Sequence, residues 1–527
     1  MVTNNKLINF KTKLWNMACN LRGNMDPLEF KDYILSLLCF HYLSEKFENY
    51  LKDQARITIE DYPNHYKEPE LLKELKINLG FLLKPKQLWS YFIQTIDRRE
   101  FRYNLLANAF VAVEDTSKDT AYHEVFENLF SAIDLDNNKI SKNESQKNTL
   151  VAMLITQINN ICPFNSDCSD CLGDIYEYLI GEFAASDGKK AGKFFTPSSV
   201  STLMAQIVTS DPDKNHFNHN LKIYDPTCGS GSLLLKVVKQ LKVKIKTQTN
   251  YKINLYGQEL NNTTYNLARM NMLLYTIKHF EIDLVFTNTL TDLCGRHLDL
   301  VKKEGGFNII VSNPPYSQKW LLDTNEESYA KEDQRFSGYP KLAPKSFADL
   351  AFVQHMLYCL KKEGICTVVL PHGVLFRGNK EASIRKQIIE NHYLDAVIGL
   401  PKNIFYGTPI ATCILVFRKC QKQDNILFID ASNQYQPGTK NSLSQTNVDC
   451  ILDLYLKRQT IKNISYVAPL DQIIANNYEL SISRYIINEN TNEIIDIATV
   501  KSNIESLEAK KQELNQQIRI YLEELGI

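Results

Sequence analysis

The sequence has no excess of charge of either sign. Its 527 residues contain 60 Lys and Arg against 60 Asp and Glu, so the formal net charge at pH 7 is zero. A strongly basic protein attracts nucleic acid through its overall field, and this chain has no such field. Any contact with nucleic acid must therefore be local or shared with a partner. With 44% hydrophobic and 23% charged residues, the composition is otherwise that of an ordinary globular protein.

Long apolar runs and a targeting signal are also missing. No uninterrupted apolar stretch approaches the roughly 18 residues of a membrane span. The start, MVTNNKLINF, lacks the pattern of a signal peptide. The 12 cysteines are scattered over the chain, as is typical of proteins in a reducing compartment. We therefore expect a cytoplasmic protein with no membrane partner.

Clusters of metal-ligating residues are equally scarce. Only Cys162, Cys168 and Cys171 lie close together, and the gap between the last two is that of a zinc hook. No second Cys pair or His follows at a suitable spacing. Buried or surface thiols are the favoured interpretation, and we predict no metal site.

Proline and glycine are sparse in the first 165 residues. Apolar residues recur there at helical spacing, for example at Ile34, Leu37, Leu38 and His41. This predicts an N-terminal helical domain over residues 1–165, within a chain whose length suggests roughly three to four domains. Helices that only pack together are the default interpretation. Contact with DNA or with a partner is the alternative, which periodicity does not test.

Strand and helix patterns alternate from about residue 170 to residue 435, which predicts a parallel sheet with helices on both faces. We place this α/β domain at residues 166–440. The last two strands follow each other closely, so we expect them to form a hairpin at one edge of the sheet. The expected strands are 221–226, 253–260, 307–312, 365–371, 394–401 and 412–419, and the expected helices are 232–241, 263–275 and 351–362.

The strand at 307–312 ends in the catalytic candidates Asn313, Pro314, Pro315 and Tyr316. Open α/β sheets bind their ligands at this carboxyl edge. Because the prolines restrict the backbone, the Asn313 side-chain oxygen and the Pro314 carbonyl are held side by side as two acceptors for one planar NH₂ group. An amine that donates both protons loses conjugation with its ring and becomes a better nucleophile, while Tyr316 offers a stacking surface. A plain turn after a strand is the alternative, and this segment alone leaves both open.

The strand at 221–226 runs into a glycine loop, DPTCGSGS (225–232), that precedes a helix. Gly229 and Gly231 permit a tight turn and the close approach of a ligand. The third glycine of the dinucleotide fingerprint is replaced by Leu234, so the loop does not match the pattern that binds a pyrophosphate. A cofactor with a nucleoside and a charged amino acid fits better, with Asp225 available for its ammonium group.

Glu259 ends the next strand, where an acidic side chain commonly binds ribose hydroxyls. Its distance from the glycines exceeds the usual ~20 residues, and the segment 242–252 is the insertion that explains the difference. A solvated surface carboxylate is the alternative interpretation. Asn288 occupies the equivalent edge of a third strand, and we expect it to reach the base of the cofactor.

Seven segments, in this order along the chain, resemble the modification (methyltransferase) subunit of type I restriction-modification systems. The stretch 14–35 resembles the helical start of the same family, so the similarity covers most of the chain. The motif NPPY alone is weakly specific, whereas seven motifs in one order are strongly so. The segments are GKFFTPSSV (192–200), DPTCGSGSLL (225–234), LYGQELN (255–261), NPPY (313–316), ADLAFVQHML (348–357), LPHGVLFRG (370–378) and IGLPKNIFYGTPI (398–410).

The resemblance implies an α/β, Rossmann-like S-adenosylmethionine-dependent methyltransferase sheet with an N-terminal helical domain and a C-terminal helical tail. The implied reaction is methylation of adenine N6 in DNA, on a base flipped out of the duplex, which protects host DNA. The matching catalytic residues are Asn313, Pro314 and Tyr316, although the family often has Phe at the last position. The matching cofactor residues are Lys193, Phe194, Phe195, Thr196, Pro197, Ser198, Asp225, Gly229, Ser230, Gly231, Ser232 and Glu259.

The implied partners are double-stranded DNA, a separate DNA-specificity subunit, a second copy of the chain and, for cleavage, a restriction subunit. The loop 317–344 is either a lid over base and cofactor or a disordered surface insertion. Three other functions stay open. The first is methylation of a glutamine amide in proteins, which also uses NPPY. The second is a self-sufficient restriction-methylation enzyme, although no nuclease domain is visible in the sequence. The third is a catalytically idle DNA-binding scaffold.

The last region, 441–527, ends in an apolar stripe of alternating three- and four-residue steps. Ile504, Leu507, Leu514 and Ile518 belong to this stripe, and Lys511 interrupts it. The pattern predicts a coiled-coil-like terminal helix. Such a helix either packs on its own domain or docks on the specificity subunit.

Overall fold

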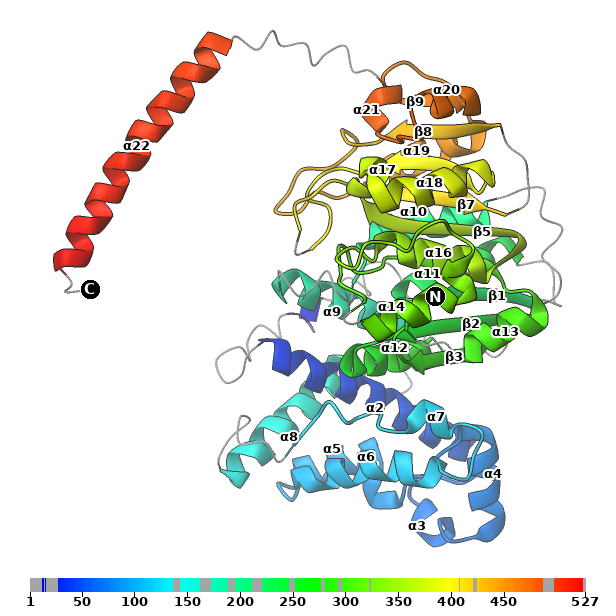
Figure 1. Cartoon of the computed structure of the whole chain (residues 1–527). Coiled ribbons are helices and arrows are strands. Elements are labelled where there is room, and N and C mark those ends of the chain that lie inside the picture. The colour runs from blue at the N-terminus through cyan, green and yellow to red at the C-terminus, as the bar shows by residue number, and fades with distance from the viewer. Residues whose placement is uncertain are drawn as a thin grey trace.

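The chain consists of a helical part, a large sheet with helices on both faces, and a last helix that stands apart from both (Figure 1). The structure is a computed structural model of the whole chain. It describes residues 12–13, 15, 27–135, 143–161, 172–187, 195–210, 220–245, 252–275, 280–291, 296–321, 324–406, 408–419, 424–486 and 497–524.

The helical part is built around an apolar core to which α9 (Leu172–Asp187) and α12 (Asn262–Leu274) also contribute. The long helix α2 (Pro27–Asp53) buries the stripe predicted from the sequence, with Ile34, Leu37, Leu38 and His41 all at most 2% exposed. The predicted N-terminal helical domain is therefore confirmed. The other helices of this part are α3 (Tyr62–His65), α4 (Pro69–Leu79), η1 (Pro85–Gln87), α5 (Trp89–Asp97), α6 (Tyr103–Ser117), α7 (His123–Phe126) and α8 (Glu144–Ile161).

The sheet has nine strands in the order β3-β2-β1-β4-β5-β7-β6-β8-β9. The first five of these run parallel, and β7 is inserted antiparallel to both of its neighbours. The predicted α/β fold is confirmed. The strands are β1 (Asn220–Asp225), β2 (Lys252–Glu259), β3 (Phe280–Phe286), β4 (Phe307–Ser312), β5 (Leu360–Pro371), β6 (Leu394–Gly399), β7 (Thr412–Arg418), β8 (Asn425–Asp430) and β9 (Ser465–Pro469).

The prediction that the hairpin lies at an edge of the sheet was wrong. β6 and β7 do pair antiparallel, but β7 lies between β5 and β6, and β8 and β9 continue the sheet beyond them. Both strands of the pair are buried along almost their whole length, so each needs a neighbour on either side. The sheet thus extends past residue 440, and the division of the chain into three regions stays a prediction.

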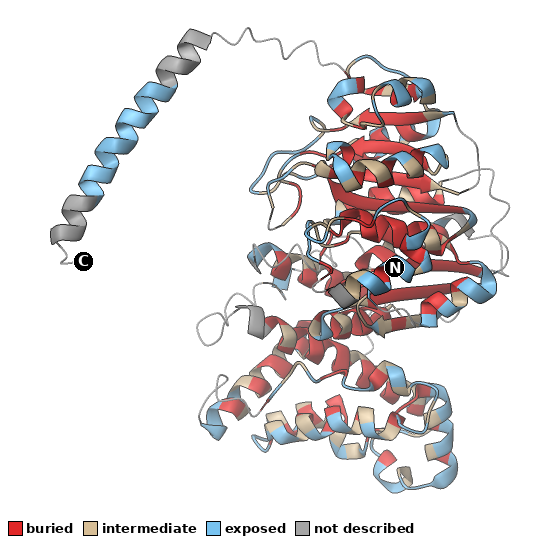
Figure 2. Cartoon of the chain, in the orientation of Figure 1, coloured by how far each residue is buried: buried red, intermediate tan, exposed pale blue. Residues whose placement is uncertain are grey.

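Two apolar cores cover the two faces of the sheet, because successive residues of a strand point to opposite sides. Ile223 belongs to the core beneath α10 (Ser198–Thr209), α11 (Ser232–Ile245) and α19 (Gln445–Lys457). The next residue, Tyr224, belongs to the core on the other face. That face carries α13 (Arg296–Glu304), α16 (Asp349–Cys359), α17 (Gly373–Phe376), α18 (Asn379–Glu390), α20 (Leu470–Ala475) and α21 (Ile482–Tyr485). Figure 2 shows the buried layer along the strands.

The helical part is joined to the sheet through α9 (Leu172–Asp187) and α12 (Asn262–Leu274), which both pack on α2. Arg269 on α12 donates hydrogen bonds to the backbone carbonyls of Glu124 (3.0 Å) and Glu127 (2.7 Å). The neighbouring Asn266 donates to the carbonyl of Asn128 over 2.9 Å. The helix that follows the second strand of the sheet therefore also anchors the helical part.

The segment 317–344 folds against the sheet where the structure describes it. It contains α14 (Thr324–Glu332) and α15 (Gln334–Ser337). Arg335 is only 2% exposed and donates to the backbone carbonyls of Thr289 and Leu290 over 2.6 Å and 2.9 Å. A disordered insertion is therefore wrong for the described part of this segment, and a lid that closes over DNA stays a prediction.

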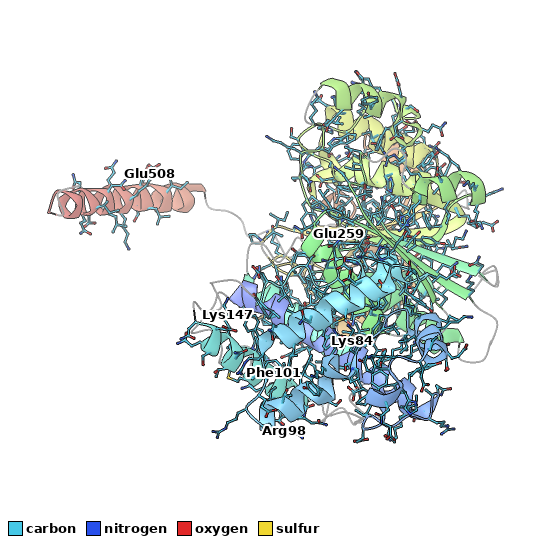
Figure 3. All side chains as sticks on the ribbon, turned by 90° about the horizontal axis from the view of Figure 1, so that it is seen from below. Lys84, Arg98, Phe101, Lys147, Glu259 and Glu508 are labelled. Carbon is cyan, nitrogen blue, oxygen red and sulfur yellow. The ribbon has the colours of Figure 1, made fainter. Side chains whose placement is uncertain are left out.

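The last helix, α22 (Ile497–Glu524), does not rest on the rest of the chain (Figures 1 and 3). All its side chains from residue 504 to residue 518 are exposed, and Glu508 is labelled on it in Figure 3. Ile504, Leu507, Leu514 and Ile518 are each at least half exposed. Between residues 504 and 518, therefore, no side chain of this helix packs into a core of its own chain. In the described ranges, no helix combines the length and apolar character that crossing a membrane requires.

Candidate functional site

A pocket opens at the carboxyl ends of β1 and β4. The glycine loop and Asn313 of the NPPY motif, which are far apart in the sequence, both contribute to its wall, whereas Pro314, Pro315 and Tyr316 are not among the lining residues. The Phe195–Thr196 segment closes a third side. The lining residues are Phe195, Thr196, Asp225, Thr227, Cys228, Gly229, Ser230, Ser232, Leu233 and Asn313.

The glycine loop needs its glycines for backbone conformation and for space. Gly229 and Gly231 have φ angles of 55° and 75°, in the left-handed region that other residues rarely adopt. A Cβ at Gly231 would also lie 2.7 Å from the side chain of Met272. The Asn271 side chain donates to the Ser230 carbonyl over 2.9 Å and so fixes the loop on α12.

Asp225 is the buried carboxylate of the pocket, only 2% exposed. Its Oδ1 accepts the backbone N–H of Thr227 over 3.0 Å. Burial raises the pKa of Asp225 to about 7. Among the described residues, no Lys or Arg acts on this carboxylate. A cation that entered the pocket would therefore find an unpaired carboxylate.

Glu259 joins the end of β2 to the glycine loop. One of its oxygens accepts the backbone N–H of Gly229 over 3.1 Å, and the other accepts that of Asn261 over 2.8 Å. Burial raises the pKa of Glu259. Figure 3 labels it within the sheet domain. Directly after it, Leu260 is 54% exposed, an apolar surface at the same strand end to which the sequence analysis assigned no role.

Asn313 is held at both ends of its side-chain amide. Its NH₂ group donates to the Thr196 hydroxyl over 3.1 Å, and its oxygen accepts the Tyr316 hydroxyl over 2.7 Å. Burial raises the pKa of Tyr316, so this hydroxyl stays protonated and acts as the donor. The ring of Tyr316 lies edge-on to Phe405, with 6.1 Å between ring centroids. Phe405 stands in a segment that the sequence analysis used only for the resemblance. The aromatic pair Phe405–Tyr406 within that segment was the only signal in the sequence.

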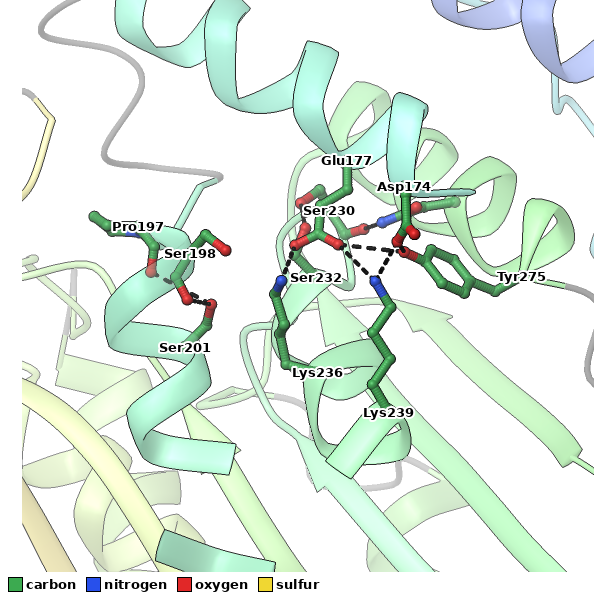
Figure 4. A network of polar contacts seen from close by, with 11 residues as sticks. Asp174, Glu177, Pro197, Ser198, Ser201, Ser230, Ser232, Lys236, Lys239 and Tyr275 are labelled. Atoms are coloured by element: carbon green, nitrogen blue, oxygen red, sulfur yellow. Dashed lines mark hydrogen bonds and ion pairs between the residues drawn. The ribbon is translucent and has the colours of Figure 1, made fainter. Parts of the chain in front are cut away.

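The remaining residues that were predicted to belong to the site do not all lie in the pocket wall. Lys193 and Phe194 lie outside the described residues, as do Cys162, Cys168 and Cys171. Phe195 packs against Gly181 and Tyr406, so one of its faces belongs to the core. Pro197 and Ser198 do not line the pocket, and their carbonyls accept the Ser201 hydroxyl in the first turn of α10 (Figure 4). Asn288 also does not line the pocket. Its side-chain oxygen accepts the backbone N–H of Leu290 over 3.1 Å.

An ion-pair network fixes the helix that starts at Ser232. Lys236 and Lys239 on α11 pair with Glu177 and Asp174 on α9, and Tyr275 donates to Asp174 over 2.7 Å (Figure 4). Ser230 and Ser232 form a hydrogen bond of 2.9 Å at the head of α11. The floor of the pocket is therefore braced from the helical side. Among the described residues, no group of His, Cys, Asp and Glu has the arrangement of a metal site.

Comparison with known proteins decides the family. The N-6 DNA methylase family matches residues 167–494, and the HsdM N-terminal domain matches residues 10–158. The chain belongs to the N-6 DNA methylase family. It is 35% identical to the methylase subunit of the type I restriction enzyme MpnII from Mycoplasma pneumoniae, over 98% of this chain and 96% of that subunit. It is 29% identical to the MjaVII methylase subunit of Methanocaldococcus jannaschii, over 78% of this chain and 73% of that subunit.

A crystal structure of a similar protein supports the same conclusion. The type I restriction-modification methyltransferase subunit of Streptococcus thermophilus superposes with a TM-score of 0.80 at 33% identity, over 91% of this chain and 99% of that one. This methylase subunit is thus of the type I restriction-modification kind. The predictions of the family, of a methyltransferase fold and of adenine methylation in DNA are confirmed. A protein glutamine methyltransferase was the wrong alternative.

Proposed function

We propose that this methylase subunit transfers a methyl group from S-adenosylmethionine directly to N6 of an adenine flipped out of duplex DNA. One observation carries the proposal. The glycine loop, with Asp225, and the NPPY motif, with Asn313, line a single pocket. A cofactor on the loop and a base on the motif would therefore meet in one space, as in-line transfer requires.

Asp225 in the pocket wall, together with Glu259 and Leu260 outside that wall, fits the proposed cofactor. Asp225 offers an unpaired buried carboxylate to its ammonium group. Each oxygen of Glu259 accepts one backbone N–H and retains a lone pair for a ribose hydroxyl. Leu260 presents an apolar face beside them for the base, and we keep Asn288 as a more distant candidate for the same base. Leu234 in place of a third glycine suits a ligand without phosphate.

The NPPY motif fits a planar amine. S-adenosylmethionine supplies an electrophilic methyl group, so the chain itself needs to orient the amine more than to remove a proton. The oxygen of Asn313 accepts one hydrogen bond from Tyr316 and keeps a second lone pair for N6. The Pro314 carbonyl is the second acceptor, and the ring of Tyr316 is the stacking surface. Extrusion of the base costs a few kcal/mol, which stacking partly offsets.

Base recognition must come from a partner. The chain carries no net charge, and its described residues form no separate domain for target recognition, whereas site-specific methylation requires base readout. We propose that a DNA-specificity subunit supplies it, with double-stranded DNA, a second copy of this chain and a restriction subunit completing the system. The exposed apolar stripe of α22 is the contact we assign to the specificity subunit.

The test is methyl transfer by the complex of this chain with the specificity subunit that we propose as its partner. Tritiated S-adenosylmethionine and genomic DNA from a methylation-deficient strain should give N6-methyladenine by mass spectrometry. Asn313→Ala removes one acceptor for N6 and should lower the transfer rate at least about 100-fold, because misplacement of a reacting group alone costs that much. Its affinity for S-adenosylmethionine should stay near that of the wild type. Near-normal transfer by Asn313→Ala would contradict the assignment of Asn313 as an acceptor for N6.

A further inference from the structure

Two motifs of the sequence, ADLAFVQHML (348–357) and LPHGVLFRG (370–378), have no part in the pocket described above. They meet in space through Asp349 and Arg377. Asp349 starts α16 and is fully buried, and its Oδ2 lies 3.2 Å from Nη1 of Arg377. The same guanidinium lies 3.3 Å from Glu381 and stacks over the ring of Phe347 at 4.4 Å. Arg377 is therefore held in one place by three neighbours.

The other oxygen of Asp349 reaches the catalytic motif. Its Oδ1 accepts the backbone N–H of Ser317 over 2.9 Å. Ser317 directly follows Tyr316, and its φ angle is 51°, in the left-handed region that is unfavourable for a residue with a Cβ. A single buried carboxylate thus holds the strained turn that ends NPPY. The motif is fixed at its other end by Ser312, whose hydroxyl lies 2.7 Å from that of Thr227 in the glycine loop.

We propose that Asp349, anchored by Arg377, is a positioning residue for methyl transfer. It holds the turn at Ser317 and thereby keeps the Tyr316 ring and the Asn313 amide in their places. Asp349 touches neither the base nor the cofactor, so it acts through the backbone of the motif. This inference rests on the proposed function of NPPY.

The test uses two replacements that both remove the charge of Asp349. Asn keeps an oxygen that accepts the Ser317 N–H, whereas Leu branches at the same carbon and has no acceptor. In the complex with the specificity subunit, we expect Asp349→Asn to retain kcat within about 3-fold of the wild type. We expect Asp349→Leu to lower kcat about 100-fold, as misplacement of a catalytic group by about 1 Å does. The KM for DNA and the affinity for S-adenosylmethionine should change less than about 3-fold in both.

Asp395 provides the matched control. It is also a buried carboxylate, 3% exposed, and pairs with Arg458 at 2.7 Å and Arg418 at 3.3 Å, but it contacts no residue of the site. Asp395→Asn and Asp395→Leu should lower the melting temperature without a change in kcat per folded molecule. If Asp349→Leu does not fold, Asp349→Ala replaces it, since a smaller side chain strains the site less.

Three outcomes are distinguishable. Equal kcat for the Asn and Leu variants of Asp349, or a loss no larger than that of the Asp395 variants, would overturn the positioning role. An inactive wild-type complex would instead count against the proposed function. A higher kcat for Asn than for Leu at position 349, with no such difference at position 395, supports the inference. If Asp349 had only a structural role, the Asn and Leu variants would show the same pattern at both positions.

Discussion

The Tyr316 hydroxyl donates a hydrogen bond to the side-chain oxygen of Asn313 over 2.7 Å, within the NPPY motif itself. The Asn313 oxygen, which we propose as a hydrogen-bond acceptor for the target amine, is thus already oriented before a base enters. The Thr196 hydroxyl holds the other end of the same amide. Orientation of Asn313 therefore depends on two neighbours, one local and one that comes from a different part of the chain.

We expect Tyr316→Phe to be mild and Tyr316→Ala to be severe. Phe removes the hydroxyl, but Thr196 still orients the amide, so the transfer rate should fall less than about 10-fold. Ala also removes the stacking surface, which is worth roughly 1–3 kcal/mol per base. Single-turnover transfer with the specificity subunit present measures both. A Phe variant as impaired as the Ala variant would mean that the hydroxyl, and not the ring, is the essential group.

The affinity for S-adenosylmethionine should rise with pH through neutrality. Burial raises the pKa of Asp225 from its ordinary 3.8 to about 7, so its carboxyl is mostly protonated at pH 6 and mostly ionised at pH 8. Because the ammonium group binds the ionised form, affinity should be about tenfold weaker at pH 6 than at pH 8. Isothermal titration at the two pH values measures this, and Asp225→Asn should flatten the difference.

The same pKa shift has an opposite effect on the stability of the ligand-free protein. A folded-state pKa above the unfolded one means that the folded state binds the proton more tightly. The free energy of unfolding should therefore fall as pH rises from about 4 to about 7, and it should fall less in Asp225→Asn. A contribution of Asp225 that increased with pH would contradict the burial of an unpaired carboxylate.

The cofactor site should respond to changes at Glu259 and Gly231. Glu259→Ala removes charge-assisted hydrogen bonds to the ribose, worth about 1.5–3 kcal/mol. Gly231→Val places a branched side chain on a left-handed backbone and against Met272. Isothermal titration should detect weaker binding of S-adenosylmethionine by both. The control is Glu281→Ala, an exposed carboxylate near the amino end of β3, and its affinity should be unchanged. Unchanged affinity in both Glu259→Ala and Gly231→Val would mean that the cofactor site is placed wrongly.

Sequence patterns predicted the parts of this site that depend on local order. A strand that ends in polar or turn residues places them at the carboxyl edge, which is why Asp225, Glu259 and Asn313 could be predicted to lie there, and Asp225 and Asn313 line the pocket. The bond between Thr196 and Asn313 joins residues 117 positions apart, and no local pattern encodes it. The position of β7 between β5 and β6 depends on which strands pair, and periodicity does not report pairing. Both β8 and β9 were missed, and β9 is short and passes directly into α20.

The apolar stripe of α22 should be required for assembly with the specificity subunit. Ile504, Leu507, Leu514 and Ile518 are each at least half exposed, and burying such side chains in a helical interface is favourable by roughly 1.5–3 kcal/mol each. We expect deletion of residues 500–527 to weaken co-purification with that subunit, and the double variant Leu507→Gln and Leu514→Gln to do the same. The purified chain alone should bind S-adenosylmethionine but methylate duplex DNA poorly and without sequence preference.

Two neighbouring polar positions on α22 provide the control for this stripe. Glu508→Gln with Lys510→Gln introduces the same two side chains on the same helix, at positions that are also exposed. It leaves the apolar residues intact, so assembly should be as in the wild type. If the control weakened the complex as much as the Leu variants, helix stability and not the stripe would be responsible. An undiminished complex after the deletion would leave α22 without a role in assembly, and robust site-specific methylation by the isolated chain would remove the need for a partner.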